Sequence, residues 1–305
     1  MNEQDYWEDL NCCVCSSNKR QRFYPSAVCP NKDMRDMFWG LNSTQNRRKY
    51  HAEINKCINC GHIYSSPYLK EEILHDYYSG SDFDNSWQVE EKFPLKTVRR
   101  YLEASLGFLP DRDCIVDVGC DVGFLLEGAA ELGFSKGFGI EPNKMAAAKA
   151  KERLKQQAGM EIINAVYRDD VVPASTVSCL SFIHVLDHIT KPDKILKIAH
   201  NHLKPNGIII AATHNINSVI SKVSGRRFPP INLQHAQFFS PHSLRLLFER
   251  TGFEFLKICS TWNDYPLFHY IRYVPFIPEI VKDKLVSVMD EVHLKSLSLA
   301  LPLGN

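Results

Sequence analysis

The sequence predicts an α/β chain in which a domain with a mainly parallel sheet and an antiparallel edge strand follows a small metal-binding module. Residues 114–123 read Cys-Ile-Val-Asp-Val-Gly-Cys-Asp-Val-Gly, an apolar run that ends in a glycine-punctuated turn. Strand-like and helix-like stretches alternate behind this turn, as they do in chains that form parallel sheets. Ahead of it, two Cys-x-x-Cys pairs stand at residues 12–15 and 57–60.

The glycine-punctuated turn joins a predicted strand to a predicted helix. Gly119 and Gly123 let the backbone turn tightly and approach a ligand closely, because glycine has no Cβ. Apolar residues from 122 to 132 then recur at helical spacing, and a second apolar run, residues 137–140, ends in Glu141. This order is the front half of a Rossmann-like nucleoside-binding unit, in which Glu141 would accept hydrogen bonds from two ribose hydroxyls.

The glycine spacing indicates which nucleoside is favoured. Dinucleotide-binding turns read Gly-x-Gly-x-x-Gly, whereas Gly119 and Gly123 are four residues apart and no Gly-Lys-Ser/Thr follows. A ribose without a diphosphate fits better, which indicates S-adenosylmethionine; an α/β turn without a ligand is the alternative. Together with Asp117, the pattern resembles the first motif of class I methyltransferases, Asp-x-Gly-x-Gly-x-Gly. Asp121 replaces the middle glycine, and aspartate tolerates a left-handed backbone better than most residues.

The stretches after residue 176 extend this resemblance. Residues 177–183 form an apolar run suited to a buried parallel strand. A helix start follows at Thr190-Lys-Pro-Asp193, with Thr190 as the N-cap, and Pro205-Asn-Gly207 breaks the chain before the apolar run 208–213. This order is similar to the methyltransferase segment written Leu-x-His … Leu-Lys-Pro-Gly-Gly, and His188 matches its histidine.

The end of the core and the flanking segments complete the predicted elements. A helix is predicted from Ser240-Pro241 to Gly252, and Phe253–Ile258 is the next strand candidate. The resemblance to class I methyltransferases covers about residues 95–260, and it implies their fold and their cofactor. We assign six residues to the cofactor site: Asp117, Gly119, Cys120, Gly123, Glu141 and His184. Outside the core, helices are predicted at residues 69–78, 90–106 and 280–297.

The paired cysteines at the N-terminus predict one zinc site. A tetrahedral zinc ion needs four soft ligands, and each Cys-x-x-Cys turn presents two thiolates on one side of a tight loop. Disulfides are the alternative, but the acidic first residues carry no apolar signal stretch, which predicts a reducing, cytoplasmic location. The predicted ligands are Cys12, Cys15, Cys57 and Cys60. Three neighbours are spare candidates: Cys13, Cys29 and His62.

The cysteine pairs and the methyltransferase pattern together resemble one group in particular, the zinc-containing methyltransferases of deoxysugar nucleotides and related small metabolites. In that group Cys-x-x-Cys-Gly is followed by a proline and Tyr-Tyr, as it is here by Pro67 and Tyr77-Tyr78. A Glu-His pair precedes the late helix of the group, and this chain has Gln234-His235. The resemblance implies a small-molecule methyl acceptor. Because a histidine can take the acceptor's proton, His235 is the first candidate catalytic residue and His188 the second.

The composition narrows the functions that remain. Basic and acidic residues nearly balance, 36 against 35, so no overall positive field would gather nucleic acid. No stretch reaches the roughly 18 apolar residues that a membrane helix requires. An RNA methyltransferase with a zinc module and a non-catalytic scaffold are the alternatives, the latter because of Asp121 and Gln234. The sequence leaves open the oligomeric state and whether carbon, oxygen or nitrogen is methylated.

The positions of the cysteine pairs and of the methyltransferase pattern predict where the domains of the chain begin and end. With 305 residues, the chain is long enough for two domains, one of them with a full-sized core. The predicted parts are a zinc-binding module at 1–66, a helical linker on the substrate side at 67–108, an S-adenosylmethionine-binding methyltransferase core at 109–262 and a C-terminal extension at 263–305.

Overall fold

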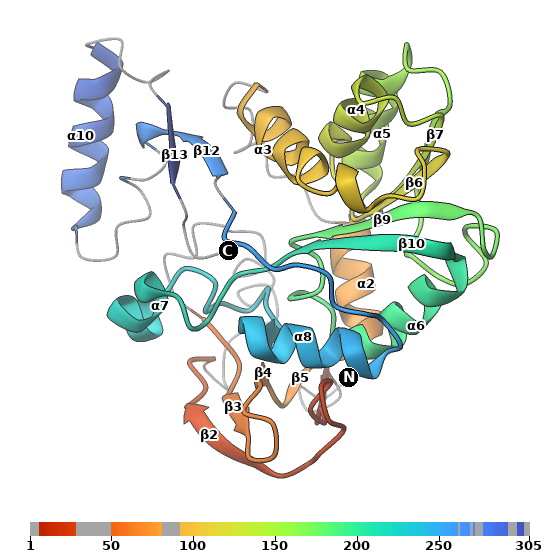
Figure 1. Cartoon of the computed structure of the whole chain (residues 1–305). Coiled ribbons are helices and arrows are strands. Elements are labelled where there is room, and N and C mark those ends of the chain that lie inside the picture. The colour runs from red at the N-terminus through yellow and green to blue at the C-terminus, as the bar shows by residue number, and fades with distance from the viewer. Residues whose placement is uncertain are drawn as a thin grey trace.

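The computed structural model of the chain describes residues 6–28, 50–80, 92–261, 263–268, 271, 277–291 and 298–301. Its centre is a five-stranded parallel sheet with the strand order β10-β9-β6-β7-β8 (Figure 1). In chain order the strands are β6 (Cys114–Val118), β7 (Lys136–Ile140), β8 (Met160–Ile163), β9 (Val177–Ile183) and β10 (Leu203–Ala212). The predicted α/β, Rossmann-like fold with a mostly parallel sheet is confirmed.

Helices cover both faces of the parallel sheet, which is why the strands β6 and β9 at its centre are mainly apolar and buried along almost their whole length. They are α3 (Lys92–Glu103), α4 (Phe124–Glu131), α5 (Lys144–Leu154), α6 (Pro192–His202) and α8 (Pro241–Arg250). Ile115 on β6 belongs to one apolar core with α3, α4 and α5, whereas its neighbour Val116 belongs to a second core with α6 and α8. Figure 1 shows these two groups of helices on opposite sides of the sheet.

Two local predictions, the helix cap at Thr190 and the chain break at residues 205–207, differ from the structure. Thr190 does not cap α6, because the N-cap position is Lys191 and the Thr190 hydroxyl donates instead to Glu71 Oε1 at 2.8 Å. The stretch 205–207 does not precede a strand but lies inside β10, where the register against β9 shifts and Asn206 has a φ of +64°. A bulge of this kind bends a strand without ending it.

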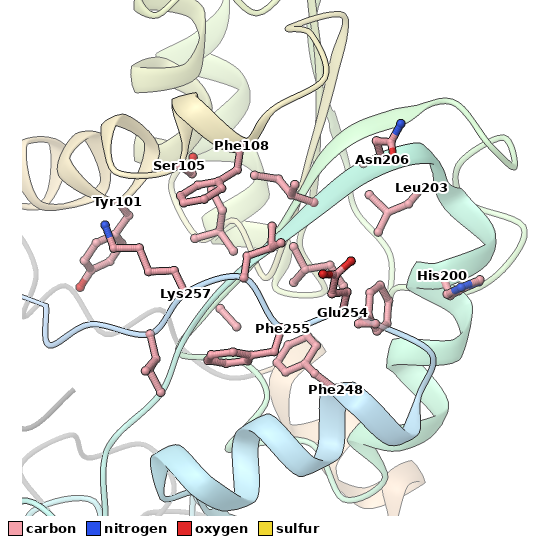
Figure 2. A pocket seen from close by; sticks show the side chains of 18 of the residues that line it. Tyr101, Ser105, Phe108, His200, Leu203, Asn206, Phe248, Glu254, Phe255 and Lys257 are labelled. Carbon is pink, nitrogen blue, oxygen red and sulfur yellow. The ribbon is translucent and has the colours of Figure 1, made fainter.

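The strand predicted at Phe253–Ile258 is not formed. Residues 253–261 run without strand pairing along the outer side of β10, across a cavity of about 1240 Å³. Figure 2 shows Phe248 and Phe255 on one side of this cavity and Ser105 and Phe108 on the other. A strand needs a hydrogen-bonding neighbour about 4.8 Å away, and the cavity separates this segment from β10. None of the residues predicted to bind cofactor or metal lines the cavity.

The N-terminal segment and the core share one antiparallel sheet with the order β11-β4-β3-β2. Its strands are β2 (Arg20–Tyr24), β3 (Ile54–Cys57), β4 (Ile63–Ser65) and β11 (Gln237–Phe238). Gln237 pairs with Tyr64, so a strand from late in the chain completes the sheet of the cysteine-containing segment. Val14 and Tyr64 also belong to the same apolar core as Leu180 and Leu247. The cysteine-containing segment is therefore packed onto the core.

The remaining described elements are short or lie near the C-terminus. β1 (Trp7–Glu8) pairs antiparallel with β5 (Tyr68–Leu69), and β12 (Asn263–Pro266) pairs antiparallel with β13 (Ser298–Leu301), so the antiparallel strands that the structure describes lie outside the central sheet. The other elements are α2 (Glu71–Gly80), α7 (Val219–Ser224), α10 (Glu279–Glu291) and short 3-10 turns at Leu106–Phe108 and Gly225–Arg227.

The three helices predicted outside the core correspond to α2, α3 and α10. Residues 90–91 and 292–297 of those predictions lie outside the described ranges. Among the helices that the structure describes, none has the length and apolar character needed to span a bilayer.

Candidate functional site

We call the two Cys-x-x-Cys turns, residues 12–15 and 57–60, the knuckles, and their four cysteine thiols meet in one cluster. The Sγ atoms of Cys12, Cys15, Cys57 and Cys60 all lie within 4.8 Å of one another. Cys12 Sγ is 3.5 Å from Cys60 Sγ, and Cys15 Sγ is 3.4 Å from Cys57 Sγ. A tetrahedral zinc ion with Zn–S bonds of about 2.3 Å holds its sulfurs about 3.8 Å apart. The four thiols therefore fit a zinc ion.

The two knuckles share one backbone geometry. In each, the residue after the second cysteine is left-handed: Ser16 has a φ of +57° and Gly61 a φ of +75°. The N–H of this residue donates to the carbonyl of the first cysteine, at 2.7 Å in the first knuckle and 3.0 Å in the second. This repeated turn aims both thiols of a pair to the same side, as ligation of one metal ion requires.

The spare ligand candidates do not join the four thiols. Cys13 Sγ is 3.5 Å from His62 Nε2 and 3.4 Å from Gln237 Oε1. His62 Nε2 lies 3.0 Å from the same Gln237 oxygen and donates to it. Both side chains are therefore engaged with Gln237, away from the predicted metal position. Cys29 lies outside the described residues.

The glycine-punctuated turn has the conformation that its sequence requires. Gly119, Asp121 and Gly123 have φ values of +70°, +49° and +86°, so Asp121 adopts the left-handed backbone that was expected of it. A Cβ at Gly119 would stand 2.7 Å from Val185 Cγ2. The turn therefore approaches the loop after β9 so closely that a side chain at this position would fill the space.

Two buried carboxylates, Asp117 and Glu141, lie near this turn. Glu141 follows β7, and its two oxygens accept from the backbone N–H groups of Asp121 at 3.0 Å and Asn143 at 2.8 Å. Asp117 lies inside β6 and accepts from Ser181 Oγ at 2.5 Å. Burial raises the pKa of both carboxyls to about 7, although these hydrogen bonds act to lower it. Asp117 thus ties two strands together, whereas Glu141 stands at the turn itself.

Four histidines and one aspartate meet at the carboxyl end of the parallel sheet, and we call His184, Asp187, His188, His214 and His235 the histidine cluster. The first three follow β9, His214 follows β10, and His235 precedes β11. The ring centroids of His184 and His214 are 4.7 Å apart, and those of His188 and His235 are 4.4 Å apart. Open α/β sheets bind their ligands at this end. Two sets of three members that share Asp187 also have the spacing of metal ligands.

Asp187 is the centre of the histidine cluster. Its Oδ2 accepts from His214 Nδ1 at 2.9 Å and lies 3.7 Å from His235 Nε2. Burial acts to raise the pKa of Asp187, but the His214 hydrogen bond and the neighbouring histidines hold this pKa well below its usual range. Asp187 Oδ1, His184 Nδ1 and His235 Nε2 have no hydrogen-bond partner within the described part of the chain. A charged carboxylate with unused hydrogen-bonding capacity therefore faces the imidazoles.

Burial lowers the pKa of three of these histidines. Burial lowers the pKa of His184 to about 3 and that of His235 well below its usual value. It also lowers the pKa of His188, although Asp187 acts to raise it. His235 is buried, with Nδ1 3.0 Å from Asn232 Oδ1, whereas His188 is half-buried. A neutral imidazole can accept a proton, and of this pair His188 is the more accessible.

Tyr78 connects the histidine cluster to the glycine-punctuated turn. Its hydroxyl is 3.2 Å from His188 Nδ1, and its backbone carbonyl accepts from Asn143 Nδ2 at 3.1 Å. Asn143 is also the residue whose N–H binds Glu141. Tyr78, near the end of α2, therefore lies between the histidine cluster and the glycine-punctuated turn.

Asp187 and His214 are members of the site that were not expected from the sequence. His214 stands just past β10, much as His184 stands just past β9. Polar residues that follow neighbouring parallel strands meet at one edge of the sheet. This rule, applied to the predicted strand 208–213, would have identified His214.

Comparison with known proteins found a matching family model and a curated relative. A family model described as a methyltransferase domain matches residues 89–258, more than half of the chain. The chain is also 26% identical over 153 residues to the mitochondrial ubiquinone biosynthesis O-methyltransferase of Dictyostelium discoideum, a match that covers 44% of this chain and 48% of the relative. The chain thus spans about half the length of the curated relative it matches.

Similar solved structures include a SAM-dependent methyltransferase of Thermotoga maritima, described as a possible histamine N-methyltransferase. It is 20% identical to this chain, with a TM-score of 0.44, and the match covers 55% of this chain and 75% of that one. Another is a SAM-dependent methyltransferase of Aquifex aeolicus, with 15% identity, coverage of 59% and 94%, and a TM-score of 0.47.

Proposed function

The chain belongs to the methyltransferase-domain family, and from this premise we propose that it transfers a methyl group from S-adenosylmethionine to a small-molecule acceptor, such as a sugar nucleotide or a secondary metabolite. The observation that carries this proposal is the histidine cluster beside the glycine-punctuated turn, at one edge of the parallel sheet. The similarity to a ubiquinone biosynthesis enzyme supports a small acceptor. The net charge of +1 counts against nucleic acid.

The cofactor site that we propose lies between the turn and the loops after β7 and β9. S-adenosylmethionine supplies an activated methyl group when it is bound, so the chain has to position the acceptor and take its proton. Glu141 is suited to the ribose hydroxyls because it stands at the turn and each of its oxygens, which accepts one backbone hydrogen bond, can accept a second. The residues that we propose to bind the cofactor are Asp117, Gly119, Cys120, Gly123, Glu141 and His184.

We assign the proton transfer to His188 and His235. The half-buried position of His188 supports direct contact with the acceptor. The burial of His235 and its contact with Asn232 support a role in orienting its neighbour. The charge on Asp187 would stabilise the imidazolium that forms when the proton arrives, as carboxylates do beside catalytic histidines.

The four N-terminal cysteines would hold one zinc ion in a structural role. All four ligands come from the protein, which leaves no open position for a substrate. Zinc would stabilise a segment with little apolar core of its own. Because thiolate ligation requires reduced cysteines, this site supports a reducing compartment such as the cytoplasm.

Glu141→Ala is expected to weaken S-adenosylmethionine binding roughly ten- to a hundredfold, because a hydrogen bond to a charged group contributes about 1.5–3 kcal/mol. Titration calorimetry with the purified chain measures this change. Glu161→Ala removes an exposed carboxylate on the neighbouring β8 and should leave the affinity unchanged. An unaltered affinity in Glu141→Ala would mean that the ribose is held elsewhere.

The acceptor class can be tested directly with methyl-labelled S-adenosylmethionine. We expect the label to appear in the low-molecular-weight fraction of a cell extract and not in purified RNA from the same cells. RNA binding should also be weak and should lack the steep salt dependence of a protein that contacts many phosphates. Label in RNA, together with such a salt dependence, would favour the RNA methyltransferase alternative.

A further inference from the structure

Gln237 joins the two N-terminal knuckles to the loop that follows β9. Its side-chain oxygen accepts from Cys13 Sγ at 3.4 Å and from His62 Nε2 at 3.0 Å. Its side-chain nitrogen donates to the backbone carbonyls of Ile189 at 3.3 Å and Thr190 at 3.0 Å. One amide group therefore contacts both knuckles on one side and this loop on the other.

These four contacts use the whole hydrogen-bonding capacity of the Gln237 amide, which has an oxygen with two lone pairs and two N–H donors. The two backbone carbonyls can only accept, so they fix the orientation of the amide. Gln237 and His62 are each only 1% exposed. Loss of a partner at this depth leaves a buried polar group unsatisfied. Glutamate at this position would place an acceptor against both carbonyls.

The two donors to Gln237 stand next to the predicted metal ligands in the chain. Cys13 lies between the two predicted ligands of the first knuckle, and His62 follows the last predicted ligand, Cys60, by two residues. An ion that holds both knuckles would therefore also hold the backbone from which both donor side chains extend.

The two carbonyls that accept from the Gln237 amide belong to the loop after β9, which carries His188. Ile189 and Thr190 directly follow Asp187 and His188 in the chain. The carbonyl of Asp187 also accepts from the backbone N–H groups of Ala236 at 2.9 Å and Gln237 at 3.0 Å. The loop from Asp187 to Thr190 is thus held by both the backbone and the side chain of Gln237.

We propose that Gln237 is a positioning residue through which the metal-bound knuckles hold the Asp187–Thr190 loop in the geometry that methyl transfer requires. The inference rests on the zinc site and the activity proposed above. It gives the N-terminal segment a role in the chemistry without any contact between the metal and the substrate.

Hydrogen exchange of the full chain tests this coupling, with the amide of His188, which donates to the Val185 carbonyl at 3.0 Å, as the reporter. In the wild type, removal of zinc by a chelator should speed exchange at residues 185–190 roughly tenfold, as expected when hydrogen bonds of ordinary strength are lost. In Gln237→Met exchange should be fast already, and the chelator should add nothing, while zinc content and cofactor affinity stay at the wild-type level. Turnover should fall in parallel.

The matched control is a second buried amide in the same antiparallel sheet. Asn55 is 2% exposed, and its Nδ2 donates to the carbonyl of Ser66, a residue outside the loop after β9, at 2.7 Å. Asn55→Asp and Gln237→Glu make the same change from amide to carboxylate. Only Gln237→Glu should speed exchange at residues 185–190. If both variants speed this exchange equally, Gln237 only stabilises the sheet as any buried amide would, and the proposal is overturned.

Two other results would also overturn it. Loop exchange in the wild type that does not respond to the chelator would show that the knuckles and the loop are not coupled. Normal loop exchange and turnover in Gln237→Met would show that another residue holds the loop. Wild-type protein that contains no zinc would defeat the zinc site proposed above, and exchange in Gln237→Met would then still decide whether Gln237 positions the loop.

Discussion

His188→Ala is expected to lower the rate of methyl transfer by about 10²–10⁴, the usual cost of losing a general base. The half-buried imidazole is neutral at pH 7, since burial lowers its pKa, and it is the accessible member of the His188–His235 pair. Cofactor affinity should change little, because the ribose is assigned to Glu141 on another loop. Initial rates and calorimetry on the same preparation separate the two effects.

The pH profile distinguishes a base from a residue that only positions the acceptor. Below the pKa of His188 the imidazole is protonated and cannot take a proton, so the wild-type rate should rise with pH up to a value below about 6.5, the ordinary histidine pKa. This acid limb should be absent in His188→Ala. His242→Ala, which removes an exposed histidine on α8, serves as the control. If His235→Ala loses the limb and His188→Ala keeps it, the two roles have to be exchanged.

Cys57→Ser is expected to abolish stoichiometric zinc binding and to unfold the N-terminal knuckles. Structural zinc sites contribute about 10–16 kcal/mol of binding free energy, which is coupled to folding. Cys57 Sγ lies 3.4 Å from Cys15 Sγ, so its loss removes one corner of the predicted tetrahedron. Metal analysis should show about one equivalent of zinc in the wild type and almost none in the variant, with a lower thermal transition.

Cys259→Ser is the control for this experiment, because Cys259 is an exposed thiol outside the four-cysteine cluster. It should retain the wild-type zinc content and stability. Wild-type protein purified without chelators that contains less than about a tenth of an equivalent of zinc would contradict the predicted site. Retention of zinc by Cys57→Ser would instead indicate a different set of ligands.

Much of the fold could be predicted because the signals for it are local. Between Cys114 and Gly123, a run of apolar residues predicts a strand and two glycines predict a turn. The structure forms β6 and the left-handed turn there. The strand at Phe253–Ile258 was predicted wrongly, because a run of apolar residues alone does not form a strand. A strand also needs a neighbour to pair with, and a cavity lies between this segment and β10.

The sequence by itself determined the parallel-sheet fold, the glycine-punctuated turn with Glu141 and the four-cysteine cluster, because each depends on residue types at short, fixed spacings. Only the tertiary structure decided that Asp187 stands among four histidines and that Gln237 joins Cys13 and His62 to the loop after Asp187. These partners are separated by up to 224 residues of chain. Which of them meet depends on how the parallel sheet and the antiparallel sheet pack together, and no local pattern records that packing.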